Sequence, residues 1–321
     1  MRKSIRIRKG LLALFMLTAI VSLTACAGKK ESTNEKKLTI VTTLFPDYDF
    51  ARQIAGDKAE VKLLLSPGVE AHDYDPSPAD IISINKADLF IYTGEYMELW
   101  VPGILSSLES DKVTVVDASE NISLIKSADE EHHEEDGHSH EYDPHIWTSP
   151  KNAIIMVNNI LKAIEKKDPA NKEYYEKNAE EYISQIKELD SEFAEIAKNA
   201  KNPTIYFGGR FAMIYFVKEY GLGYLSAFDS CSSETEPSAK LVADMVDAMK
   251  KNGASVVYYE ELTDPKSAQA IADEIGGTTL LLHSCHNVSL EDFNNGATYV
   301  SLMQQNVIDR KSTRLNSSHS L

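Results

Sequence analysis

The sequence predicts an α/β protein of two lobes, each built on a mainly parallel sheet flanked by helices, with one long rigid helix joining them. Three observations predict this fold. Short apolar segments alternate with amphipathic segments from residue 37 onward, as in βαβ units. Residues 170–200 then contain neither Gly nor Pro and space their apolar residues three and four apart, which is typical of a long helix. After residue 203 the first alternation begins again.

The first lobe is expected over residues 37–168. Its first strand ends at Pro46, and the helix that follows ends at Gly56. A later helix has Ser77 as a suitable N-cap and Pro78 in its first position. The strands are expected within residues 37–46, 59–68, 88–94 and 112–119, and the helices within 47–56, 77–87, 97–108 and 149–169.

The linking helix is expected over residues 169–200 and the second lobe over residues 201–310. Such a long helix favours a rod between two lobes; the alternative is a coiled-coil arm. The strands of the second lobe are expected within residues 203–209, 224–230, 254–262 and 278–285, and its helices within 210–221, 238–253 and 264–277.

Composition and charge narrow the class of ligand. Apolar residues make up 43% of the chain, enough to bury a sizeable core. The formal net charge is −16 and the isoelectric point is about 5.0. This charge argues against nucleic acid as a partner, because phosphates would be repelled. It is compatible with a protein that collects cations.

The N-terminus has the pattern of an exported lipoprotein. A basic segment precedes an apolar run over residues 11–23, which is too short to span a membrane comfortably. We expect residues 1–25 to be a signal peptide, Cys26 to be lipidated, and residues 26–36 to be a flexible tether. The mature protein would then be extracytoplasmic and anchored to the cell membrane. The alternative is an ordinary signal peptide that is cleaved elsewhere.

Two further cysteines remain if Cys26 carries a lipid. In an oxidising compartment Cys231 and Cys285 are expected to form a disulfide. The alternative is that Cys285 is a thiolate metal ligand, since it lies in the sequence HSCHN. The polar, aperiodic residues 311–321 are expected to be a non-native tail.

Four histidines lie where the cleft of such a fold is expected. Ligands of open α/β sheets bind beyond the carboxyl ends of the strands, and two facing lobes would form one cleft there. His72 follows the second predicted strand, His145 precedes a helix, and His283 and His286 end the last strand. Imidazole and carboxylate ligands suit zinc or manganese.

A second group of histidines, His132, His133, His138 and His140, lies in an acidic segment over residues 129–142. It offers several ligands without a preformed geometry, and ordering them costs conformational entropy. We expect weaker metal binding here than at a fixed site. The loop would collect zinc at the rim, sense an excess or supply the cleft; the alternative is a solvated loop with incidental affinity.

Several motifs occur together in one order: LTAC, HDYDPSP, the histidine-rich segment, DPHIWTSP, the long helix, ETEPSA and YYEEL. In this the chain resembles the metal-binding lipoproteins of zinc and manganese ABC importers, especially the zinc-uptake branch. The resemblance covers roughly residues 37–310. It implies a metal in the cleft between the lobes and no chemistry on a substrate. It also implies delivery to a membrane permease that a cytoplasmic ATPase powers, and we expect a monomer.

The resemblance also implies ligands. Its first-lobe histidines match His72 and His145, and its fourth ligand falls on His283. Its third ligand falls on Arg210, which cannot ligate because it is always protonated, so that position is lost or re-used as the partner of an acid. The predicted set is therefore His72, His145 and His283, completed by Glu260 or His286. Glu260 would otherwise support a histidine ring, and Glu236 is expected to be a cap or a supporting acid.

Zinc is the expected cargo. A four-coordinate site rich in histidine favours Zn²⁺ over Mn²⁺, which prefers more oxygen ligands. The zinc branch also often carries an insertion like residues 129–142. Three alternatives are a manganese-binding lipoprotein, a surface adhesin and a zinc hydrolase. The hydrolase would need an open coordination position and a base, and the sequence contains no HExxH motif.

Overall fold

The computed structural model describes residues 37–316, except 73, 109–111, 128–140 and 229–236, and for 309–316 the backbone alone. These residues belong to one compact unit that begins at Lys37. The predicted signal peptide, tether and lipidated Cys26 lie outside them. So do the four histidines of the acidic segment, Cys231 and Glu236.

The first lobe is built on a parallel sheet of four strands in the order β2-β1-β3-β4. Thr42 of β1 lies opposite Leu63 of β2 and Ile91 of β3, so the carboxyl ends of these strands meet at one edge. The elements are β1 (Leu38–Thr42), α2 (Phe45–Ala55), the 3₁₀ turn Gly56–Lys58, β2 (Ala59–Leu63), α3 (Pro78–Lys86), β3 (Leu89–Tyr92), α4 (Val101–Leu105) and β4 (Thr114–Asp117).

The second lobe repeats this topology. Its four parallel strands have the order β6-β5-β7-β8. As in the first lobe, the first strand of the sheet in sequence lies between the second and the third. The elements are β5 (Thr204–Phe207), α7 (Ile214–Glu219), β6 (Gly223–Ser226), α8 (Ala239–Asn252), β7 (Val256–Tyr259), α9 (Lys266–Ile275), β8 (Thr278–Leu281), α10 (Leu290–Asn294) and α11 (Tyr299–Asn316). The prediction of two parallel-sheet lobes is confirmed.

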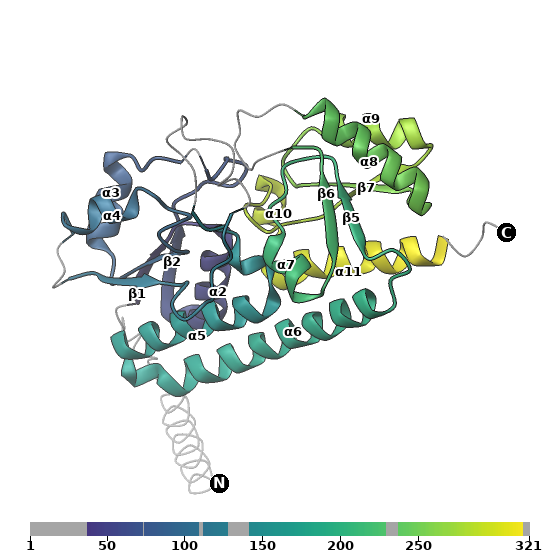
Figure 1. Cartoon of the computed structure of the whole chain (residues 1–321). Helices are drawn as coiled ribbons and strands as arrows, with labels where there is room; N and C mark the ends of the chain where they lie inside the picture. Colours follow the sequence, from purple (N-terminus) through teal and green to yellow (C-terminus); the bar gives the residue numbers. More distant parts are fainter. Residues whose placement is uncertain (1–36, 73, 109–111, 128–140, 229–236, 317–321) are drawn as a thin grey trace, which may run out of the picture. The chain divides into compact units, whose positions relative to one another are not determined.

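Three helical segments join the two sheets in the sequence: α5 (Pro150–Lys167), the 3₁₀ turn Pro169–Asn171 and α6 (Lys172–Lys198). The 27-residue α6 packs against α5 and α2 and, farther along, against α11 (Figure 1). Its buried residues recur every three or four positions, which places them on one face: Tyr175, Ala179, Tyr182, Ile186, Leu189 and Phe193. The long helix that the sequence predicted therefore contacts helices of both lobes.

A single apolar cluster extends through both lobes. It contains Ile40 of β1 and Phe207 of β5, together with Trp147, Tyr182 and Tyr299. Separating the sheets would expose this surface to water, at a cost of roughly 25 cal/mol per Å² of apolar area. The lobes are consequently held together by their core as well as by the chain that connects them.

Two helices are shorter than the sequence predicted. Residues 97–108 were expected to be helical, but α4 covers only Val101–Leu105, where Pro102 and Gly103 are poor residues for extending a helix. Residues 210–213 were also expected to be helical, and α7 begins only at Ile214. The backbone N–H of Arg210 donates to Glu260 Oε1 at 3.4 Å, so this segment is held by a contact with the loop after β7.

A pair of buried carboxyl groups lies at the carboxyl edge of the first sheet. Asp47 Oδ2 accepts a hydrogen bond from the Thr93 hydroxyl at 2.7 Å. Glu98 accepts from the N–H groups of Thr93 and Gly94, both at 3.1 Å, and from the Thr43 hydroxyl. Asp47 Oδ1 has no hydrogen-bond partner among the described residues. Burial raises the pKa of Asp47 well above its usual value, and it raises the pKa of Glu98 to about 7.

We expect the Asp47→Asn variant to melt at a higher temperature than the wild type, with a larger difference at pH 8 than at pH 5. A carboxyl group whose folded pKa is raised binds its proton more tightly when folded, so stability falls as pH rises through the folded pKa. For the neighbouring Glu98 the pH range over which stability is lost runs from the ordinary pKa of a glutamate, 4.5, to about 7. Asparagine removes the ionisation of residue 47, and each 1 kcal/mol gained raises the melting temperature by roughly 2–4 °C.

Thermal unfolding followed by circular dichroism measures this difference. Asp244→Asn, at an exposed position of α8, is the matched control and should shift the melting temperature equally little at both pH values. A stabilisation by Asp47→Asn that is the same at pH 5 and pH 8 would contradict the assigned ionisation.

Candidate metal centre

The loop that carries His72 is held by the second lobe. The Asn287 side chain donates hydrogen bonds to the carbonyls of Ser66 and Val69, at 3.0 and 2.7 Å. The N–H of Gly68 donates to the Val288 carbonyl at 2.9 Å. These bonds place residues 66–72, which follow β2, against the segment that follows β8.

His145 is buried and oriented by an acid two residues before it. Asp143 Oδ1 lies 3.0 Å from both the backbone N and the ring Nδ1 of His145. A carboxylate only accepts hydrogen bonds, so Nδ1 carries the proton and Nε2 keeps its lone pair. That Nε2 lies 3.2 Å from the Nε2 of His72.

His286 is positioned by Glu261, which lies two residues after the end of β7. The Glu261 carboxylate accepts hydrogen bonds from the N–H of Ser284 at 2.8 Å, from its hydroxyl at 2.7 Å, and from the N–H of His286 at 3.0 Å. Between them Cys285 has a φ of 61°, in the left-handed region, which turns the chain sharply. The Trp147 indole donates to the Ser284 carbonyl at 2.8 Å and so ties this turn to the segment after His145.

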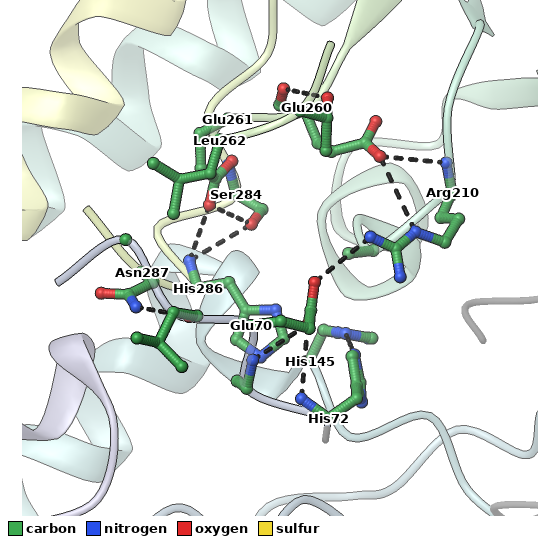
Figure 2. Close-up of a pocket in the computed structure, with 15 residues that line it drawn as sticks. Glu70, His72, His145, Arg210, Glu260, Glu261, Leu262, Ser284, His286 and Asn287 are labelled. Carbon is green, nitrogen blue, oxygen red and sulfur yellow. Dashed lines mark hydrogen bonds and ion pairs between the residues drawn. The ribbon is translucent and has the colours of Figure 1, made fainter. Parts of the chain in front are cut away.

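The structure brings His72, His145 and His286 together, with one ring nitrogen of each within 4.8 Å of the others (Figure 2). Ligand nitrogens around a tetrahedral zinc with Zn–N bonds of about 2.1 Å lie roughly 3.4 Å apart, close to the separation seen here between His72 and His145. Burial, and then the neighbouring His72, His145 and Arg210, lower the pKa of His286 well below its usual value. Its imidazole is thus held in the neutral form that binds metals. Its Nε2 is buried and has no hydrogen-bond partner among the described residues.

His283 and Glu260, both in the predicted ligand set, do not join this group. His283 is buried, and its Nδ1 accepts a hydrogen bond from the N–H of Cys285 at 2.9 Å. Asn306 holds its backbone, accepting from its N–H at 2.8 Å and donating to its carbonyl at 2.9 Å. The left-handed turn at Cys285 lies between the two histidines: His286, the predicted alternative to Glu260, lines the cavity, whereas His283 does not.

Arg210 pairs with two acids, in line with the expectation that its position is re-used. Its Nη2 lies 3.2 Å from Glu70 Oε2, and its Nε lies 3.9 Å from Glu260 Oε1. Burial raises the pKa of Glu260, and the charge of Arg210 partly opposes that shift. A Cβ at Gly209 would lie 1.8 Å from Glu260 Oε2, so a larger residue there would displace the Glu260 carboxyl group.

These groups line a cavity of about 160 Å³. It has room for several water molecules, or for a metal ion and part of its hydration shell. Figure 2 shows Glu70 beside the three histidines, with its carboxylate directed toward Arg210, and Glu260 on the far side of Arg210. A divalent cation at the histidine nitrogens would therefore have acidic groups close by.

Four residues that position the site were not among the predicted ones: Glu70, Asp143, Glu261 and Asn287. Asp143 could have been found, because an acid two residues from a histidine in a loop often orients its ring. The roles of Glu261 and Asn287 depend on backbone contacts between distant segments, for which the sequence carries no local signal.

The predicted disulfide stays a prediction. Cys285 is fully buried and forms no disulfide within the described residues, and burial raises the pKa of its thiol well above its usual value. A high thiol pKa disfavours the thiolate that metal ligation would need. Its predicted partner, Cys231, lies outside the described residues.

Residues 40–309 match the family model described as zinc-uptake complex component A, periplasmic. The chain belongs to this family. The match covers both lobes and every residue of the cavity. The family consists of components of a metal uptake system and is not an enzyme family.

Two relatives bear names that refer to zinc. The high-affinity zinc uptake system protein ZnuA of Bacillus subtilis is 39% identical over 299 residues, which is 92% of this chain and 93% of that protein. The zinc-binding lipoprotein AdcA of Streptococcus pneumoniae is 37% identical over 295 residues, or 91% of this chain. The match spans only 58% of AdcA.

Solved structures agree with the fold. The Zn(II)-bound ZnuA-like domain of S. pneumoniae AdcA has a TM-score of 0.73 at 35% identity, over 86% of this chain and 98% of that one. The laminin-binding protein Lmb of Streptococcus agalactiae, described as having adhesin and metal-transporting activity, has a TM-score of 0.74 at 26% identity, over 86% and 99%. Within the described part of the chain, no helix is both long and apolar enough to cross a membrane.

We expect the Asp143→Asn variant to bind zinc about 10- to 100-fold more weakly than the wild type. An asparagine amide can donate to Nδ1 of His145, which would move the ring proton to Nε2, the atom that faces the other histidines. Titration with zinc against a competing chelator measures the affinity. Asp244→Asn serves as the control with the same change of charge, and an unaltered affinity for Asp143→Asn would argue against this role.

Proposed function

We propose that this protein is the extracytoplasmic substrate-binding component of an ABC transporter, which captures a zinc ion and delivers it to a membrane permease. The convergence of three histidine nitrogens from segments of both lobes carries this proposal. The family match and the zinc-binding names of its relatives support it.

His72, His145 and His286 are the proposed ligands, each held by a neighbouring acid so that its nitrogen is in place before the metal arrives. Ordering ligands in advance lowers the entropy cost of binding. Glu70, Glu260 and Glu261 add negative charge at the cavity, which attracts a divalent cation. His283, held in the interior, is not among the proposed ligands.

Zinc is the proposed cargo in preference to manganese. Three imidazole nitrogens in a compact arrangement suit the tetrahedral coordination of Zn²⁺, whereas Mn²⁺ favours octahedral sites rich in oxygen. The Zn(II)-bound structure of a relative that is 35% identical supports the same choice.

The proposal extends to partners and location. The protein would dock on a permease that a cytoplasmic ATPase powers, and Cys26 would carry the lipid that holds it outside the cell membrane. It would act as a monomer and catalyse no reaction, since its role is to bind and release an ion unchanged.

Adhesion is a second candidate, because the structure of Lmb, a laminin-binding protein by its description, resembles this one at 26% identity. Binding of immobilised laminin by the metal-free and the zinc-loaded protein tests it. Saturable binding in the micromolar range or tighter would support adhesion, and binding no stronger than to albumin would exclude it.

We expect His72→Ala, His145→Ala and His286→Ala each to lower the zinc affinity more than about 100-fold, which exceeds the usual effect of a supporting residue. Competition with a chelator measures the affinity, and circular dichroism checks that each variant is folded. His283→Ala provides the contrast and should retain an affinity near that of the wild type. If His283→Ala, and not His286→Ala, abolished binding, the proposed ligand set would be wrong.

The acidic histidine segment should contribute only weak sites. We expect a variant with His132, His133, His138 and His140 all changed to Ala to keep one tightly bound zinc and to lose the additional zinc ions bound at higher concentration. Metal analysis after dialysis against increasing zinc measures the stoichiometry. Loss of the tight site in this variant would show that the segment is part of it.

A further inference from the structure

The three histidines leave a four-coordinate zinc one ligand short. Among the described residues, the group of ligand atoms within 4.8 Å of one another contains His72, His145 and His286 and no carboxylate. Arg210, which occupies the position where the resemblance places a ligand, carries a permanent charge and cannot coordinate a metal. The fourth ligand must therefore be a water molecule or a side chain that moves when zinc binds.

Glu70 is the acid best placed to move. It lies two residues before His72 on the same loop, and its Oε1 accepts hydrogen bonds from the N–H groups of Ala71 at 2.9 Å and His72 at 3.3 Å. These bonds anchor the carboxylate beside a metal ligand. Its other oxygen, Oε2, faces Arg210 Nη2 at 3.2 Å (Figure 2). One oxygen is thus fixed to the backbone, and the other is held by a single side chain.

Arg210 and Glu260 form an incomplete pair next to it. Arg210 Nη1 and Glu260 Oε2 are both buried, and neither has a hydrogen-bond partner among the described residues. The nearest approach of their charged groups, 3.9 Å between Nε and Oε1, is too long for a hydrogen bond. A buried donor and a buried acceptor that lack partners favour a rearrangement in which they meet.

We propose that Glu70 is the fourth zinc ligand and that Arg210 exchanges partners to release it. As zinc reaches the three histidine nitrogens, the guanidinium turns from Glu70 to Glu260, and Glu70 Oε2 coordinates the metal. This inference rests on the proposed zinc-binding function and specifies how that site is completed.

The balance of charge supports the exchange. A divalent cation at the histidines repels the guanidinium and attracts the carboxylate, so both groups move in the direction that the partner exchange requires. With zinc bound, its two positive charges and that of Arg210 lie among the carboxyl groups of Glu70, Asp143, Glu260 and Glu261. Arg210 then lies against Glu260, and no buried charge lacks a partner.

Competition for Glu70 also sets the affinity. Zinc must displace Arg210 to complete its coordination, so the protein binds zinc less tightly than the four ligands alone would. A carrier that hands its ion to a permease needs an affinity that permits release. By competing for Glu70, Arg210 therefore lowers the affinity for zinc while all four ligands stay available.

Cobalt substitution tests the assignment, because Co²⁺ reports its coordination through its visible absorption. In the wild type we expect a four-coordinate spectrum that stays constant between pH 6.5 and 9, since a carboxylate ligand does not titrate there. In Glu70→Gln a water fills the fourth position, and its ionisation, near pH 7 for zinc on three histidines, makes the spectrum depend on pH. Zinc affinity should fall at least about tenfold.

Three further variants separate this proposal from its alternatives. Glu260→Gln should weaken zinc binding and leave the cobalt spectrum as in the wild type, because it removes the new partner of Arg210 but no ligand. Arg210→Met should strengthen zinc binding, on the order of tenfold, by removing the competitor. Glu60→Gln, at an exposed position of β2, is the matched control and should change neither readout. Melting temperatures without metal identify any variant that fails to fold.

The proposal is overturned if the wild-type spectrum titrates like that of a metal-bound water, or if Glu70→Gln changes neither the spectrum nor the affinity. It is also overturned if Glu260→Gln, and not Glu70→Gln, makes the cobalt spectrum depend on pH. In each of these cases the three histidine variants would still lose zinc, so the proposed function would stand. If the histidine variants bound zinc normally, the proposed function itself would fail.

Discussion

The apolar core that runs through both lobes is the constraint on which the site depends. Because Ile40 and Phe207, from different sheets, belong to one buried cluster, the lobes cannot separate widely without exposing it. The cavity lies between loops that this core holds in place, and α6 packs along both lobes. Entry and release of an ion must therefore involve side chains and loops at the cavity, with the sheets staying packed. Movement of Glu70 and Arg210 is a change of that scale.

One acid stands beside each histidine of the cavity. Glu70 binds the N–H of His72, Asp143 binds both the N–H and the ring of His145, and Glu261 binds the N–H of His286. In each case the bond restricts the loop or the ring before any ligand arrives, and the acids together favour a cation. Hydrogen bonds to carboxylates are stronger than neutral ones, so three short loops acquire a defined geometry without regular secondary structure.

Much of the fold could be predicted from the sequence, because the spacing of apolar residues indicates which face of a strand or helix is buried. Alternating strands and helices predicted both sheets, and the spacing of Tyr182 and its neighbours predicted α6. His72 and His145 were expected in the cleft because each adjoins a predicted strand or helix end. The sequence did not predict that His286 lines the cavity and His283 does not, because the chain between them turns at Cys285 with a left-handed backbone, which residues other than Gly rarely adopt. The pairing of Arg210 across the cavity likewise depends on tertiary contacts.

The three histidines come from segments far apart in the chain, after β2, before α5 and after β8. A zinc ion held by all of them would act as a cross-link between these segments. Binding to the folded form alone stabilises a protein by about 4 kcal/mol when the ligand is present at 1,000 times its dissociation constant. Local opening of the loops, which exposes a chain to proteases, would become rarer by the same free energy. The lifetime of the protein outside the cell would then follow the supply of metal, with the loaded form outlasting the unloaded one.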